Sequence, residues 1–173
     1  YTRWGDAYYF VKRQMVFLVI GGVAAWVLAR LSPKRLQVIG WVLVMASLVL
    51  EVLTFTALGH SKNGNTNWVR FGVDWFGVQP SEVAKLAIVV WGADVLARKY
   101  KLLGDPKQLL IPFLPVSLLL IGLVVLQDGL GTGMIMGAMV LATLWYVGAS
   151  WKVLATSVGS VVAAGLVRVS STP

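Results

Sequence analysis

Long apolar segments separated by short polar breaks dominate this chain. From Leu109 to Leu126 no residue carries a charge, and about 20 predominantly apolar residues are enough for a helix to cross a bilayer. Hydrophobic residues make up 58% of the 173 residues and charged residues only 13%, and the mean hydropathy is +0.79. An ordinary soluble domain does not need so much apolar surface. The sequence therefore predicts an all-α, polytopic helical bundle integral to a membrane.

Six apolar segments alternate with polar connections, and we expect one transmembrane domain over residues 1–173. The chain begins at Tyr1 without an initiator Met and stops at Pro173, so we interpret it as an internal piece of a longer protein. One connection, 59–79, is rich in Gly, Asn and aromatic residues, and we expect it to fold back onto the membrane surface. The predicted spans are 10–29, 36–58, 80–97, 109–126, 131–149 and 153–167.

Basic residues give a net charge of +8, and their distribution points to lipid headgroups and away from nucleic acid. They flank the apolar segments instead of forming a stripe, as expected where cationic side chains meet anionic membrane lipids. The short connections 30–35, 98–107 and 150–152 are the most densely basic, so we predict that they are cytoplasmic. The loop 59–79 and the break 127–132 then face outward. Because the chain has no Cys, disulfides and thiolate metal sites are excluded.

The segment Gln79-Pro80-Ser81-Glu82-Val83-Ala84-Lys85 carries the strongest chemical signal. Pro80 suits the first turn of a helix, where its missing N–H is not needed. Ser81 and Glu82 place oxygen atoms near the positive end of that helix. Glu82 and Lys85 are three residues apart, so on a helix they lie on one face and can pair. An ionisable pair set into a membrane helix predicts a functional site.

Two other ionisable features lie within the predicted spans. Glu51 stands alone in the second span, and we expect it to face the interior of the bundle, with no partner identified by the sequence. Asp94 and Arg98 are four residues apart near the cytoplasmic end of the third span, and we interpret them as a plain helix ion pair.

Three segments resemble the SEDS family (shape, elongation, division and sporulation), whose members are bacterial membrane proteins of about ten spans. They are NGNTNW at 63–68, VQPSEVAKLAIVVW at 78–91 and LQDGLGT at 126–132. The sequence is most similar to the division member, with the elongation member as the nearest paralogue. The resemblance covers essentially the whole chain, as the second to seventh spans of the family fold.

The resemblance implies a peptidoglycan glycosyltransferase that polymerises lipid II, the undecaprenyl-linked disaccharide peptide, at the outer face of the cytoplasmic membrane. It also implies a class B penicillin-binding protein as transpeptidase partner, and other division proteins at the septum. In the family, a Glu, a Lys and an Asp line a central cavity, and the matching positions are Glu82, Lys85 and, approximately, Asp128. The family's proposed catalytic Asp follows the seventh span, so its position lies beyond Pro173.

Two departures from the family pattern affect these assignments. The family reads PDLGT at the break, whereas here Asp128 occupies the position of the Pro and Gly129 that of the Asp. A one-residue shift at the flexible Gly would let Asp128 replace the family Asp. In the outer loop, the usual Arg-Trp is Asn67-Trp68, and an Arg follows two places on, at position 70.

Glycosyl transfer requires a base for the acceptor hydroxyl and a cation for the departing diphosphate. We predict that Lys85 binds the diphosphate with help from Arg70, and that Gln79 and Ser81 also line the cavity. A divalent cation, Mg²⁺ or Mn²⁺, is an open alternative to which no ligand is assigned. The opposing interpretation is a buried ion network of Glu82, Lys85 and Asp128 that only holds spans together. A lipid II flippase and a non-catalytic scaffold for the transpeptidase are the rival functions.

Overall fold

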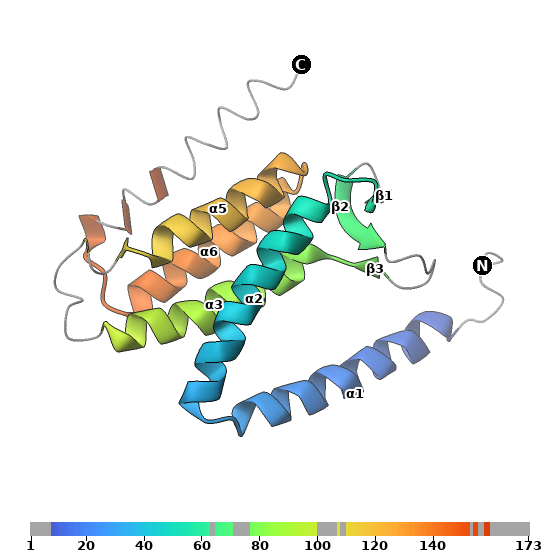
Figure 1. Ribbon diagram of the computed structural model, residues 1–173, viewed down its shortest axis with the longest axis horizontal. Coiled ribbons are helices and arrows are strands. Elements are labelled where there is room, and N and C mark those ends of the chain that lie inside the picture. The colour runs from blue at the N-terminus through green and yellow to red at the C-terminus, as the bar shows by residue number, and fades with distance from the viewer. Residues whose placement is uncertain are drawn as a thin grey trace, which may run out of the picture. The chain divides into compact units, whose positions relative to one another are not determined.

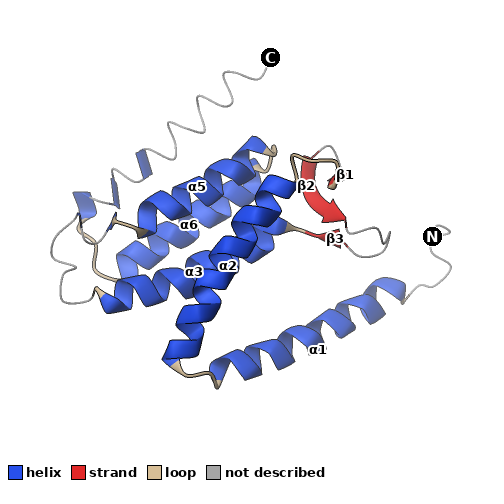
Figure 2. Ribbon diagram, viewed as in Figure 1, coloured by secondary structure: helices blue, strands red, loops and turns tan. Residues whose placement is uncertain are grey.

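The computed structural model describes residues 8–62, 65–70, 77–99, 107, 110–152, 154–155 and 158–159. The chain divides into two compact units, residues 1–36 and 37–173. Most described residues are helical, as expected, and one small sheet interrupts the helices (Figure 2). The predicted sixth span, 153–167, falls almost wholly outside the described residues.

The first unit contains helix α1, Tyr9–Ala29, which matches the predicted span 10–29 closely. A helix that is apolar on every side suits a lipid environment. At its end the Arg30 guanidinium lies 3.7 Å from the centre of the Trp26 ring, a cation–π contact typical of the polar boundary of a span. Exposed apolar side chains surround α1: Val11, Met15, Val16, Phe17, Leu18, Val19, Ile20, Val23, Trp26 and Val27.

Helix α2, Pro33–Leu53, is shifted toward the N-terminus relative to the predicted span 36–58. It begins at a proline, which is favourable at the first helical position. It ends early because the hydroxyl groups of Thr54 and Thr56 donate to the carbonyl oxygens of Glu51 and Leu53, at 2.6 and 2.7 Å. These bonds satisfy carbonyl groups that a continuing helix would have used.

The connection 59–79 folds into a three-stranded antiparallel sheet, so the all-α prediction is wrong in this segment. Its strands, in order, are β1 (Gly59–Lys62), β2 (Asn65–Arg70) and β3 (Gly77–Val78). In β2, the central strand, Val69 is completely buried, and it pairs with Gly59 on one side and with Val78 on the other. After β3 the chain leaves the sheet and rejoins the helical bundle, where the next helix starts at Pro80.

Helix α3, Pro80–Arg98, covers the residues of the predicted span 80–97 and packs against α5, α6 and β2 (Figure 1). One face is completely or almost completely buried, and its largest side chain, Trp91, contacts two further aromatic rings. Trp91 stacks on Phe113 at 6.2 Å and meets the edge of Trp41 at 5.6 Å between ring centres. The core of the second unit is therefore organised around the middle of α3.

Helices α5, Phe113–Leu126, and α6, Leu130–Tyr146, form an antiparallel pair beside α3 (Figure 1). Helix α5 starts later than the predicted span 109–126 because residues 111–112 form a turn. Helix α6 ends earlier than the predicted span 131–149 because Gly148 adopts a φ of +89°. The N–H of Ala149 bonds back to the carbonyl of Leu144 at 3.0 Å. A left-handed glycine after the last turn is a common helix ending.

One helix in the described part of the chain, Pro33–Leu53, is both long and apolar enough to cross a membrane by length and composition. Three shorter apolar helices accompany it, over Gln14–Ala29, Phe113–Leu126 and Leu130–Tyr146. Helix α3 has 19 residues but carries Glu82, Lys85, Asp94 and Arg98. This is the helix that the sequence assigns to function.

Candidate functional site

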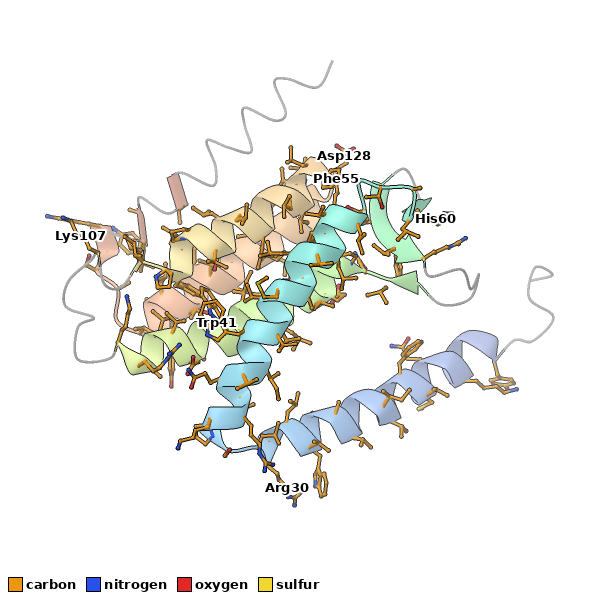
Figure 3. The ribbon with its side chains drawn as sticks, in the orientation of Figure 1. Arg30, Trp41, Phe55, His60, Lys107 and Asp128 are labelled. Atoms are coloured by element: carbon orange, nitrogen blue, oxygen red, sulfur yellow. The ribbon has the colours of Figure 1, made fainter. Side chains whose placement is uncertain are left out.

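The candidate site lies at one end of the second unit, which we call the polar end. Here α2 ends, the sheet forms, α3 begins, and α5 turns into α6 (Figure 3). Two contacts tie these segments together: the Gln127 side chain reaches Glu51 of α2, and the N–H of Arg70 bonds to the carbonyl of Leu58 at 3.2 Å. The loop 59–79 and the break 127–132, both predicted to face outward, thus share one end of the bundle.

Glu82 and Lys85 form the ion pair that their spacing predicts. Lys85 Nζ lies 2.7 Å from Glu82 Oε1. The Lys85 side chain is 22% exposed and that of Glu82 is 60% exposed, so the lysine side chain is largely covered while the glutamate side chain remains open. An ion pair with one largely exposed partner adds little to stability. The pair is therefore better explained by its positioning of the Lys85 ammonium group than by a contribution to the free energy of folding.

The start of α3 leaves two polar side chains uncommitted to the helix. Gln79 occupies the N-cap position in an extended conformation and makes no side-chain capping bond, although the N–H of Glu82 bonds to its carbonyl at 3.1 Å. Ser81 is only 3% exposed, and its hydroxyl has no hydrogen-bond partner among the described residues. A buried hydroxyl normally finds a partner, so Ser81 has capacity for one more polar contact.

Asp128 lies in the tight break between α5 and α6, with an exposed side chain and a φ of +61°. Asp is among the few residues with side chains that tolerate this left-handed conformation. The next residue must be Gly, because a Cβ atom on Gly129 would lie 2.8 Å from the carbonyl oxygen of Val124. Position 129, where the family pattern has an Asp, thus has no room for a side chain. In this chain the carboxylate is at position 128 instead.

Among the residues that the structure describes, the acidic side chains of Glu82 and Asp128 are both exposed, and Glu82 is joined to Lys85 by an ion pair. Arg70, at the end of β2, is half-buried. The polar end therefore combines a covered cation with open carboxylates, an arrangement suited to polar ligands.

Glu51 finds a partner that the sequence did not identify. Its side chain is completely buried, and the side-chain amide of Gln127, which is 4% exposed, donates to its carboxyl group. The residues are 76 positions apart, so helix periodicity could not pair them. The only sequence signal was that Gln127 is polar and ends an apolar span beside the break.

Asp94 and Arg98 form the predicted helix pair near the other end of α3, with 2.7 Å between the carboxylate and the guanidinium. In the part of the chain that the structure describes, no three His, Asp or Glu side chains gather closely enough to bind a metal ion. The described residues of the polar end thus offer single carboxylates and the cationic side chains of Lys85 and Arg70.

A family model described as "Cell cycle protein", for FtsW, RodA and SpoVE, matches residues 1–172. The chain belongs to the FtsW/RodA/SpoVE family. The probable peptidoglycan glycosyltransferase FtsW of Mycobacterium tuberculosis is 32% identical over 171 residues, which cover 96% of this chain and 32% of the relative. The stage V sporulation protein E of Bacillus subtilis is 28% identical over 148 residues, covering 85% of this chain and 40% of that protein.

The fold also matches a solved member of the family. The crystal structure of the rod shape determining protein RodA from Thermus thermophilus aligns with a TM-score of 0.64 and 27% identity, over 87% of this chain and 48% of RodA. The chain thus spans about a third to a half of the length of these relatives. The SEDS resemblance, with its membrane setting, is confirmed.

Proposed function

We propose that the chain is the central part of a peptidoglycan glycosyltransferase that polymerises lipid II at the outer face of the bacterial cytoplasmic membrane. It supplies about six of roughly ten spans, and the polar end faces outward. The relatives named as glycosyltransferases and the SEDS motifs support this activity. Because several of those relatives are named FtsW, we assign the chain to septal synthesis during division, with elongation as the alternative.

The Glu82–Lys85 pair carries the proposal. In glycosyl transfer, the acceptor hydroxyl oxygen forms a bond to C1 of the donor sugar while the bond from C1 to the diphosphate breaks. The diphosphate leaves with the bonding electrons, and the hydroxyl proton passes to a base. A cation held in place beside the leaving group stabilises the charge that develops there. Lys85 suits this role because Glu82, at 2.7 Å, fixes its ammonium group.

The remaining candidate residues would complete the cavity around this pair. Arg70 would add a second cation for the diphosphate, and Ser81 and Gln79 offer polar groups that α3 does not use. Asp128 supplies a carboxylate at the same end. We expect the general base to be an Asp from the part of the family fold that follows Pro173.

A divalent cation, Mg²⁺ or Mn²⁺, would supply further positive charge at the diphosphate. The described residues do not form a complete site for it, although Asp128 could contribute one oxygen ligand, the kind that Mg²⁺ prefers. The proposed partners are a class B penicillin-binding protein, which would crosslink the new strand, and other division proteins at the septum. Anionic membrane lipids would contact the basic connections, such as residues 30–35.

The test uses the full-length parent protein, purified with its transpeptidase partner and supplied with fluorescently labelled lipid II. Glycan strands are separated by gel electrophoresis, and heat-denatured protein is the control. Strands made by the native protein alone or with its partner would support the proposal. Movement of labelled lipid II across vesicle membranes without strand formation would replace it with a flippase. Stimulation of the partner's crosslinking without new strands would replace it with a scaffold.

A further inference from the structure

Three buried polar side chains meet where α2 ends and α5 gives way to the break. The Gln127 amide donates to the Glu51 carboxyl group and, at 3.4 Å, to the Glu51 main-chain carbonyl. The Thr54 hydroxyl donates to the same carbonyl at 2.6 Å. Glu51, Thr54 and Gln127 are 0%, 2% and 4% exposed. We call these three residues the Glu51 network.

Burial of this network needs an explanation beyond stability. In a chain that lies in a membrane, a buried carboxyl group costs free energy that apolar side chains of similar volume would not. One carboxyl oxygen, Glu51 Oε1, has no hydrogen-bond partner among the residues that the structure describes. Burying the network therefore costs free energy that apolar packing would avoid. The simplest explanation for keeping these polar residues is that they position the segments that they join.

The position of the network indicates what it holds. Gln127 directly precedes Asp128, whose left-handed backbone gives the break its shape. Thr54 directly follows α2, from which the chain enters the sheet that leads to Glu82 and Lys85. Fixing Gln127 against Glu51 therefore fixes the break, with its carboxylate, against the segment that leads to the ion pair. Hydrogen bonds with two acceptors on one residue set both distance and direction.

We propose that the Glu51 network is a positioning device, which sets the place of the α5–α6 break relative to the end of α2 and thereby orients the polar end for catalysis. Glu51 and Gln127 are positioning residues in this proposal and touch no substrate. Its activity readout rests on the proposed glycosyltransferase function, whereas its distance readout does not. A displacement of about 1 Å at a reacting centre is enough to lower a rate about 100-fold.

The test compares four forms of the full-length parent: wild type, Gln127→Leu, Glu51→Leu/Gln127→Leu and the exchange Glu51→Gln/Gln127→Glu. The single variant leaves a buried carboxyl group without its donor, so its thermal midpoint should fall. The double leucine variant removes both partners and should regain thermal stability. The exchange variant restores an amide–carboxyl pair between the two positions.

The first readout is the distance between spin labels at Phe55→Cys and Leu130→Cys, in a parent without other Cys residues. Both positions are exposed at the polar end, at 54% and 38%, and neither belongs to the network. We expect a broader or displaced distance distribution for the double leucine variant, and a distribution close to wild type for the exchange variant. Identical distributions in wild type and the double leucine variant would overturn the proposal, whether or not the protein polymerises lipid II.

The second readout is the rate of strand formation from labelled lipid II at saturating substrate. We expect the double leucine variant to be about 10-fold to 100-fold slower than wild type despite its recovered stability, and the exchange variant to regain most of the rate. A double leucine variant that is both stable and fully active would show that the network only stabilises, and would overturn the proposal. If wild type makes no strands, the proposed function fails and the distance readout still decides this inference.

Discussion

The packing of α3 against α5 predicts a large difference between two Gly→Ala substitutions. A Cβ atom on Gly92 would clash with the Phe113 ring, because it would lie 3.0 and 3.4 Å from two ring atoms and closer still to a third. That ring is completely buried and stacked on Trp91, so it cannot swing aside into solvent. Overpacking of this kind costs about 1–3 kcal/mol. Because Ala gains up to about 1 kcal/mol over Gly in a helix, we expect Gly92→Ala to lose about 1–2 kcal/mol overall.

Gly122 provides the matched control, since it is also a helical glycine and a Cβ atom there would have no neighbour within 4 Å. Gly122→Ala should be neutral or gain up to about 1 kcal/mol. The two variants should therefore differ by about 1–3 kcal/mol, or roughly 2–12 °C in thermal midpoint for a domain of this size. The measurement is the fraction of detergent-solubilised parent that stays folded after heating. Equal midpoints would refute the packing argument, whereas a partial recovery in Gly92→Ala/Phe113→Leu would support it.

Three further predictions use the same heating measurement. Asp128→Gly should keep or raise stability, because glycine adopts the left-handed conformation without strain, whereas Asp128→Val should lose about 1–2 kcal/mol; equal midpoints for the two would contradict the observed φ. Thr54→Val should lose about 1 kcal/mol with the bond to the Glu51 carbonyl, and no loss would mean that this bond is not needed to end α2. Asp94→Asn should lose less than about 1 kcal/mol, since half of the Arg98 side chain is exposed, and a larger loss would mark a role beyond a helix pair.

The start of α3 was predictable because its signals are local. Pro80 at the first position, Glu82 in the first turn and the spacing of Glu82 and Lys85 each act within one helical turn. The same is true of the Asp94–Arg98 pair. Where physical causes lie within four residues of their effects, the sequence alone was sufficient.

The sheet in 59–79 was not predicted because its aromatic and polar residues were interpreted as a loop. The residues of β2, Asn65–Arg70, do not alternate polar and apolar side chains, which is the usual strand signal, because Trp68 and Val69 are adjacent and three polar residues precede them. Val69 is completely buried. The strand depends on the pairing of Val69 with Gly59 and Val78, which lie in other parts of the chain and which no local pattern indicates.

The features of the polar end that depend on distant residues could not be derived from the sequence. Glu51 was expected to face the interior, and it is completely buried, but its partner Gln127 comes from a helix end far along the chain. The left-handed backbone at Asp128 and the lack of space at Gly129 depend on how α5 turns into α6. Such contacts follow from tertiary packing, which local spacing does not encode.

The role of Lys85 is decided by strand formation from labelled lipid II in the full-length parent, purified with its transpeptidase partner. Lys85→Ala is compared with Arg98→Ala, which breaks the other ion pair of the same helix, after equal folding and complex formation are confirmed. If the ammonium group stabilises the departing diphosphate, Lys85→Ala should be about 100-fold slower or worse, while Arg98→Ala stays close to wild type. Wild-type rates for Lys85→Ala would contradict this mechanism and reduce the Glu82–Lys85 pair to a structural contact.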